Sequence, residues 1–292
     1  MKRFTSLLLP LDGSHEAAKA ASCALWLAQA LEATLHVLYA ATQPLPEREA
    51  LARLHVPHVQ QPQVVLHQLP AHADAAVLEA ITSHDVDLVI MSARGESVST
   101  GHKLPQELGT VAQAVIERSP VPVLLLPLRY REVLPWTSML AAASGEVAAD
   151  QALEAAAQLA TALRLKLTVM YAEDGAGATH TMPFGAYADA AHHEYPRRMQ
   201  GMVERGLARC APEECDCVDQ ALLRHGDPAE MLLEQAARQA SSVLALGWHG
   251  ALGAGRALVL KRLLEQAECA LLLVRKMERS SARLKVGEEI DD

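Results

Sequence analysis

The chain has 292 residues, of which 50% are apolar and 21% are charged, so it can bury a core and is not disordered in bulk. The length suggests two domains of about 150 residues each. The formal net charge of -9 excludes a non-specific binder of nucleic acid or of an anionic membrane, because both functions need a cationic surface.

The first apolar run, Leu7 to Leu9, ends at Pro10 and is too short for an export signal. Other apolar runs are also far shorter than a membrane span. The five cysteines are an odd number, which favours free thiols in a reducing compartment. We therefore expect a cytoplasmic protein.

Short β-rich runs alternate with longer helical runs along the first half of the chain, which is typical of a parallel α/β sheet. The run Leu88 to Met91 has no polar alternation, as expected for a strand covered on both faces. In order, we predict strands near 4–9, 34–39, 63–68, 87–91 and 122–126, and helices near 14–32, 46–54, 71–84 and 109–118. In the first helix, alanines recur at helical spacing and form a narrow face of small residues.

The chain contains an internal repeat. His36-Val-Leu-Tyr-Ala is echoed by Thr168-Val-Met-Tyr-Ala at an offset of 132 residues, and Ser92 to Gly95 is echoed by Gly247 to Gly250 at an offset of 155. The second copy therefore carries 23 extra residues between its second and third strands. We predict one domain over 1–130, a second over 136–276, and a polar tail over 277–292.

Several motifs of both copies resemble the universal stress protein family. In the first copy they are Leu9-Pro-Leu-Asp-Gly-Ser14, Asp87-Leu-Val-Ile-Met-Ser-Ala-Arg-Gly95 and Ser119-Pro-Val-Pro-Val-Leu124. In the second copy they are His225-Gly-Asp-Pro-Ala-Glu230 and Leu246-Gly-Trp-His-Gly250. The order and spacing of these motifs in two copies extend the resemblance over nearly the whole chain.

The resemblance implies an adenine nucleotide alpha-hydrolase-like fold, with two tandem open parallel five-stranded sheets of strand order 3-2-1-4-5 flanked by helices. It also implies an ATP or AMP site at the carboxyl ends of the strands, where such sheets place ligands. In nucleotide-binding members, Gly-x2-Gly-x9-Gly-Ser/Thr holds the phosphates, because glycine lets backbone N–H groups approach and a helix N-terminus supplies partial positive charge. An aspartate after the first strand helps to hold the adenosine end.

The first copy matches this motif in part. Asp12 is in place, Gly95 is the second glycine, and Gly109-Thr110 is the final pair. Ser92 replaces the first glycine, however, and 13 residues separate Gly95 from Gly109 where the family motif has nine.

The second copy departs from the motif differently. Gly247 and Gly250 are present, but Leu260-Lys261 follows at the spacing of the final pair, and counting back from the last strand places Ala257-Leu258 there instead. Ser144 replaces the aspartate. The second copy is therefore predicted to be the poorer site. The alternative for both copies is structural: the glycines turn the chain after a buried strand and cap a helix.

Cys210, Cys215 and Cys217 lie in the inserted segment, near His192, His193 and His225 in sequence. Three thiolates and a histidine could bind zinc, but the spacing is not that of a common zinc motif. We predict no metal site, and ordinary cytoplasmic thiols are the alternative to a metal or redox role. Histidines 55, 58, 67 and 72 are interpreted as solvated or locally bonded.

No catalytic signature occurs, so we predict a protein that is not an enzyme. The leading hypothesis is a bacterial stress-response regulator with an ATP or AMP site that departs from the family motif. The alternatives are an interaction module without nucleotide and a zinc- or thiol-sensing variant. Protein partners of unidentified kind are expected, but no nucleic acid and no membrane. In the family that the motifs resemble, fifth strands commonly pair across a dimer. The resemblance therefore implies that the fifth strands near 123–126 and 271–274 pair within the chain as an internal pseudo-dimer, with a homodimer left open.

Overall fold

The computed structural model describes residues 4–57, 63–95, 108–173, 180–183, 194–253 and 255–276. The predicted tail over 277–292, the pair His192-His193, and His58 lie outside these residues. None of the described helices is long and apolar enough to cross a membrane.

The N-terminal half alternates strands and helices as its sequence predicts. Its elements are β1 (Ser6–Leu11), α1 (His15–Leu31), β2 (Thr34–Ala40), α2 (Glu47–Arg53), β3 (Val64–Leu69), α3 (Ala73–Ser83), β4 (Leu88–Ser92), α4 (Thr110–Arg118) and β5 (Val123–Leu126). The first strand runs two residues further than predicted, through Pro10. β1 pairs with β4 only at Leu7 and Leu8, so Pro10 pairs with β2 alone. Proline has no N–H to donate, and this is tolerated because β4 does not pair with Pro10 on the other side.

The C-terminal half repeats this order with additional elements. They are β6 (Ser138–Ala143), α5 (Val147–Ala162), β7 (Lys166–Glu173), β8 (His180–Pro183), α6 (Glu194–Leu207), α7 (Pro212–Cys215), β9 (Val218–His225), α8 (Pro228–Arg238), β10 (Val243–Trp248), α9 (Leu258–Gln266) and β11 (Ala270–Arg275). The insertion predicted between the second and third strands of this copy contains β8, α6 and α7.

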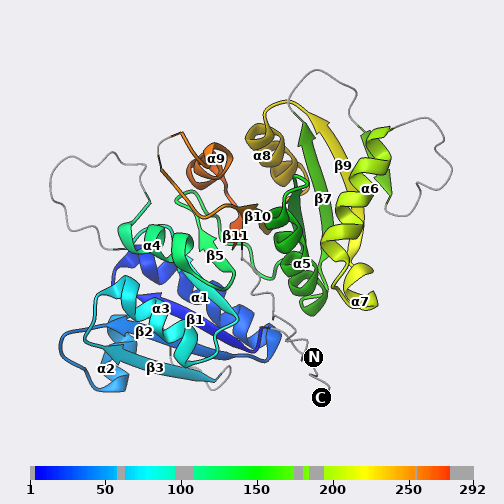
Figure 1. Ribbon diagram of the computed structural model, residues 1–292. Helices are drawn as coiled ribbons and strands as arrows, with labels where there is room; N and C mark the ends of the chain where they lie inside the picture. The colour runs from blue at the N-terminus through cyan, green and yellow to red at the C-terminus, as the bar shows by residue number, and fades with distance from the viewer. Residues whose placement is uncertain are drawn as a thin grey trace, which may run out of the picture.

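All the strands described join one 11-stranded sheet in the order β3-β2-β1-β4-β5-β11-β10-β6-β7-β9-β8. Each half therefore has the predicted strand order 3-2-1-4-5, and β8 adds an antiparallel edge strand to the second half. The two halves meet where β5 and β11 run antiparallel, with Leu125 opposite Leu271 (Figure 1). This pair confirms the predicted internal pseudo-dimer.

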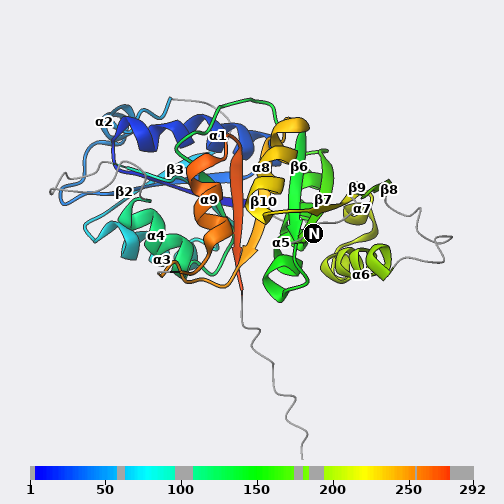
Figure 2. The same cartoon turned by 90° about the horizontal axis from the view of Figure 1, so that it is seen from above.

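Helices cover both faces of the sheet (Figure 2). Each face has one apolar layer that extends through both halves. On one face, α1 and α5 contribute mainly alanine, which lets these helices approach the strands closely. On the other face, α3, α4, α8 and α9 contribute larger side chains such as Val115 and Leu263. The candidate site lies in the loops at the carboxyl ends of the strands.

Candidate functional site

The turn after β1 and the turn after β4 meet at the carboxyl edge of the N-terminal half. These two strands are neighbours and parallel, so both chains leave the sheet on the same side. Asp12 follows β1, and Gly95 follows β4. A side chain at Gly95 would overlap Oδ2 of Asp12, so only glycine lets the backbone pass this carboxylate.

Gly109 returns the chain to the same place. Its N–H donates a hydrogen bond to the carbonyl of Ala93 at 2.9 Å. A Cβ built on Gly109 would lie 3.8 Å from the backbone nitrogen of Gly95. The loop between the two glycines thus begins and ends at one point although it is longer than the family motif. Most of that loop, 96–107, lies outside the described residues.

The N-terminus of α4 begins beside this point without a side-chain cap. Its N-cap is Gly109, no side chain accepts a hydrogen bond there, and the first turn contains no acidic residue. The first turn starts with the exposed Thr110. In contrast, α1 is capped by Ser14, whose Oγ accepts from the N–H of Ala17 at 3.1 Å. The partial positive charge at the N-terminus of α4 therefore has no anionic side chain in its own first turn to offset it.

Ser92 brings an unused polar group to the same edge. Its hydroxyl is buried at the end of β4 and has no hydrogen-bond partner in the part of the chain that the structure describes. A buried hydroxyl without a partner costs about 1–3 kcal/mol, so a ligand that accepts a hydrogen bond there would be stabilised. The candidate residues of the first copy thus lie at one edge: Asp12, Ser92, Gly95, Gly109 and Thr110.

One cation at the rim of this site has no signature in the sequence. Gly13 turns the chain at φ 84°, and a Cβ built on it would lie 3.8 Å from Nε of Arg53, the last residue of α2. Only the folding of α2 against this turn brings Arg53 and Asp12 to the same edge. The side chain of Arg53 is exposed.

The corresponding edge of the C-terminal half is closed by its own backbone. A side chain at Gly247 would overlap the carbonyl oxygen of Ala148, so the first turn of α5 lies directly against the end of β10. Gly250, at φ 87°, lies against the side chain of Arg275. Ala257, where the motif has glycine, is the N-cap of α9 at φ 51° with no side-chain hydrogen bond.

Charged side chains bind backbone groups at two places on this edge, at the loop after β10 and at the turn after β6. The N–H of Leu252, two residues after Gly250, donates to Oε1 of Glu117 from α4 at 2.9 Å. The carboxylate of Glu117 thus accepts a hydrogen bond from the loop that corresponds to the phosphate loop of the family motif. Arg205 of α6 bonds Oδ2 of Asp150 at 2.7 Å and the carbonyl of Gly145 at 3.2 Å, covering the turn after β6. Within the described ranges, the candidate residues of the N-terminal half therefore surround an edge with unoccupied backbone and hydroxyl groups, whereas the corresponding edge of the C-terminal half is filled by protein groups.

The cysteines of the insertion do not gather into a metal centre within the described residues. The only set of three or more histidine, cysteine or acidic ligand atoms within 4.8 Å of one another there is a group of histidines. Burial raises the pKa of the Cys210 thiol to about 12, and burial with nearby carboxylates also raises the pKa of Cys215 and Cys217. Protonated thiols are poor metal ligands and poor nucleophiles.

An open, mostly parallel sheet flanked by helices, with glycine turns at its carboxyl edge and two such halves in tandem, defines an adenine nucleotide alpha-hydrolase-like fold. The model of the universal stress protein family matches residues 40–127 and 135–275. The chain therefore belongs to the universal stress protein family, as its motifs predict. No curated protein matches this sequence.

Solved structures of similar length share the fold. A putative universal stress protein from Pseudomonas aeruginosa is 15% identical with a TM-score of 0.59, and the match covers 93% of each chain. A universal stress protein from Archaeoglobus fulgidus is also 15% identical with a TM-score of 0.59, over 94% of this chain and 99% of that one. A family member from Arabidopsis thaliana, solved with AMP bound, is 14% identical over 48% of this chain and 92% of its own, with a TM-score of 0.33. The AMP is a property of that protein.

Proposed function

We propose that this chain is a stress-response regulatory protein whose N-terminal half binds an adenine nucleotide, ATP or AMP. The observation that carries the proposal is the convergence of Asp12, Gly95 and Gly109 at the carboxyl edge, beside the uncapped N-terminus of α4. Family membership supports this choice of ligand, since such sites occur among universal stress proteins.

Each group at this edge has a role that its chemistry supports. The backbone N–H groups at Gly95 and in the first turn of α4 would hold the phosphates, as helix N-termini do in other folds. The carboxylate of Asp12 would accept hydrogen bonds from the adenosine end. The unpartnered hydroxyl of Ser92 would donate to the ligand, and the exposed Arg53 would add a cation at the rim.

A binding role without catalysis is part of the proposal. Oδ1 of Asp12 already accepts a hydrogen bond from the N–H of Ser14 at 2.9 Å, which ties the carboxylate to the start of α1. The thiols of the insertion have raised pKa values, which disfavours the thiol-sensing alternative. ATP incubated with the protein is expected to remain intact, as chromatography of the nucleotide would show.

Titration calorimetry of the full chain with ATP and with AMP tests the binding. Asp12→Asn keeps an oxygen for the N–H of Ser14 but removes the charge, and it should weaken binding about tenfold or more, because a hydrogen bond to a charged group contributes about 1.5–3 kcal/mol. Ser144→Asn changes the corresponding turn of the C-terminal half and should leave binding unchanged.

Two results would overturn this assignment. Absence of binding by the wild-type protein would leave the interaction module without nucleotide as the better account. Equal losses in the Asp12 and Ser144 variants would place the ligand elsewhere. Circular dichroism of each variant establishes that a loss of binding is not a loss of folding.

A further inference from the structure

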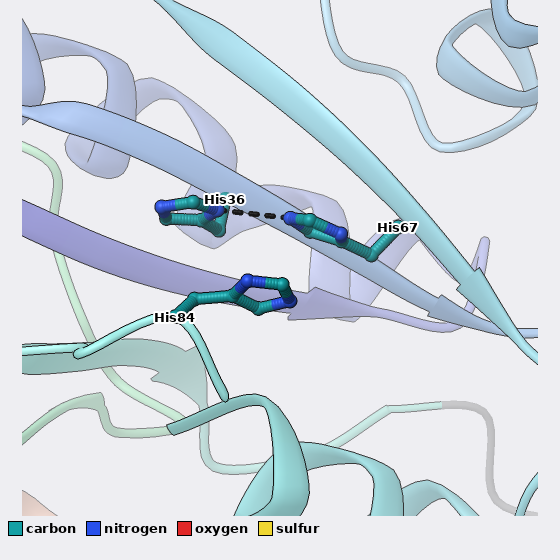
Figure 3. A group of neighbouring side chains, drawn as sticks. All are labelled: His36, His67 and His84. Atoms are coloured by element: carbon teal, nitrogen blue, oxygen red, sulfur yellow. Dashed lines mark hydrogen bonds between the residues drawn. The ribbon is translucent and has the colours of Figure 1, made fainter. Parts of the chain in front are cut away.

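Three histidines lie together on the α3 face of the N-terminal half. His36 comes from β2, His67 from β3 and His84 from the residue that ends α3 (Figure 3). His36 alternates with Leu38, which packs in the layer beneath α3, so both point to that face. One nitrogen from each ring lies within 4.8 Å of the other two.

This group is at the opposite edge of the sheet from the proposed nucleotide site. His36 lies in the amino half of β2, and the carbonyl of His84 accepts a hydrogen bond at 2.9 Å from Ser6, the first residue of β1. Asp12 and Gly95 follow the carboxyl ends of β1 and β4. The two clusters are therefore separate in the fold.

The three rings are stacked on one another rather than paired with acids. Their centroids are 4.0 to 5.1 Å apart, with interplanar angles of 11 to 25°. Among the described residues, the hydrogen bond of these side chains is the one between Nδ1 of His36 and Nε2 of His67, at 2.9 Å. Two imidazoles that share one such bond leave further ring nitrogens without a partner.

Two of the three rings are shifted toward the neutral form. Burial and the neighbouring histidines lower the pKa of His67 to about 4, and burial with His84 lowers the pKa of His36. A neutral imidazole offers a lone pair, which a protonated one lacks, and coordination requires the lone pair.

We propose that His36, His67 and His84 form a binding site for a divalent transition-metal ion of the zinc class, with a fourth position open to water. Imidazole nitrogen suits zinc, copper and nickel but not magnesium. Three ligands at zinc–nitrogen distances of about 2.0–2.1 Å place the nitrogens about 3.4 Å apart, so the rings must rotate out of the stacked arrangement to direct their lone pairs at one ion. The rings are partly exposed, which leaves a path for the ion.

Titration calorimetry of the full-length, chelator-treated protein with zinc chloride tests this site. The wild type should bind one ion per chain, and magnesium chloride should give no signal. His67→Ala and His84→Ala should each weaken zinc binding more than about 100-fold, since loss of even an outer partner of a ligand commonly costs 10- to 100-fold. His72→Ala is the matched control, because His72 is exposed at the other end of α3 and makes no side-chain cap, so it should bind as the wild type does.

Two further measurements separate this site from the cysteines and from a folding defect. The variant with Cys210, Cys215 and Cys217 all changed to serine should retain the zinc. Cobalt(II) bound to the wild type should show ligand-field bands without thiolate-to-cobalt charge transfer. A charge-transfer band, loss of the ion in the serine variant, unchanged affinity in His67→Ala or absence of wild-type binding would each overturn the proposal.

Discussion

At the scale of single residues, the two halves differ most in the groups that lie against equivalent glycines. Gly95 admits the carboxylate of Asp12 beside its backbone, whereas Gly247 admits the backbone of Ala148. The same residue type therefore makes room for an acidic side chain in one half and for a helix in the other. The motif alone does not distinguish these uses, because glycine is required in both.

The thiols of the insertion provide a test at this scale. Because burial raises the pKa of Cys210 to about 12, little thiolate forms near pH 8, and its alkylation by iodoacetamide should be at least about tenfold slower than that of a free cysteine. Mass spectrometry of digested samples over time measures the rate at each cysteine. The protein unfolded in urea is the control and should react at the ordinary rate. Rapid labelling of native Cys210 would contradict the raised pKa of this thiol.

The histidine group shows which residues sequence reasoning missed. The sequence predicts a solvated or locally bonded side chain for His67 and no site role for His36 or His84. His36 and His67 are 31 residues apart in the sequence. None of the three histidines stands at a spacing typical of a metal motif. Only strand pairing and the end of α3 bring them together.

At the scale of elements, the helices keep the positions that periodicity predicts, and their fit depends on small residues. The alanine face of α1 is buried at Ala17, Ala20, Ala21, Ala24 and Ala28, as its spacing predicts. In the insertion, α6 lies against α5 where Gly206 faces Leu153. This close approach, with Arg205 on Asp150, places the insertion over the turn after β6.

The docking of α6 predicts opposite outcomes for two glycines on one helix. A Cβ at Gly206 would lie 2.6 Å from Cδ2 and 3.1 Å from Cβ of Leu153, so Gly206→Ala overpacks the contact. A Cβ at Gly201 meets nothing within 4 Å, so Gly201→Ala should stabilise α6 by about 0.5–1 kcal/mol through helix propensity. Urea unfolding should separate the two variants by at least about 1 kcal/mol. Equal stabilities would show that α6 does not pack tightly against α5.

At the scale of the whole molecule, two copies of one fold share a single sheet. Leu124 and Leu125 of β5 face opposite apolar layers, as do Leu272 and Leu271 of β11. Trp26 of α1 also contacts Trp136, just before β6, with ring centroids 5.0 Å apart. Because both layers are continuous across the β5–β11 pair, the halves stabilise each other.

A charge at this junction should therefore destabilise the whole chain. Leu125 is fully buried opposite Leu271, so Leu125→Asp places a carboxylate among apolar side chains and should cost more than about 4 kcal/mol or unfold the protein. Val133→Asp is the control, because Val133 is 61% exposed in the connecting segment, and should change stability by less than about 0.5 kcal/mol. Urea denaturation followed by circular dichroism measures both, and an unchanged midpoint for Leu125→Asp would show that the junction contributes little.

The sequence by itself determined the repeat and the family, because these follow from local periodicity and from motifs contiguous in the chain. The strand order within each half and the partners of the fifth strands then followed from the family resemblance. The motif departures predict the C-terminal half to be the poorer site, but only the tertiary structure shows what fills its carboxyl edge, because Glu117 reaches Leu252 across the two halves and Gly247 closes on α5. It also decided that His36, His67 and His84 meet. Contacts between distant segments depend on strand register and helix docking, and neither is encoded in the spacing of residues along the chain.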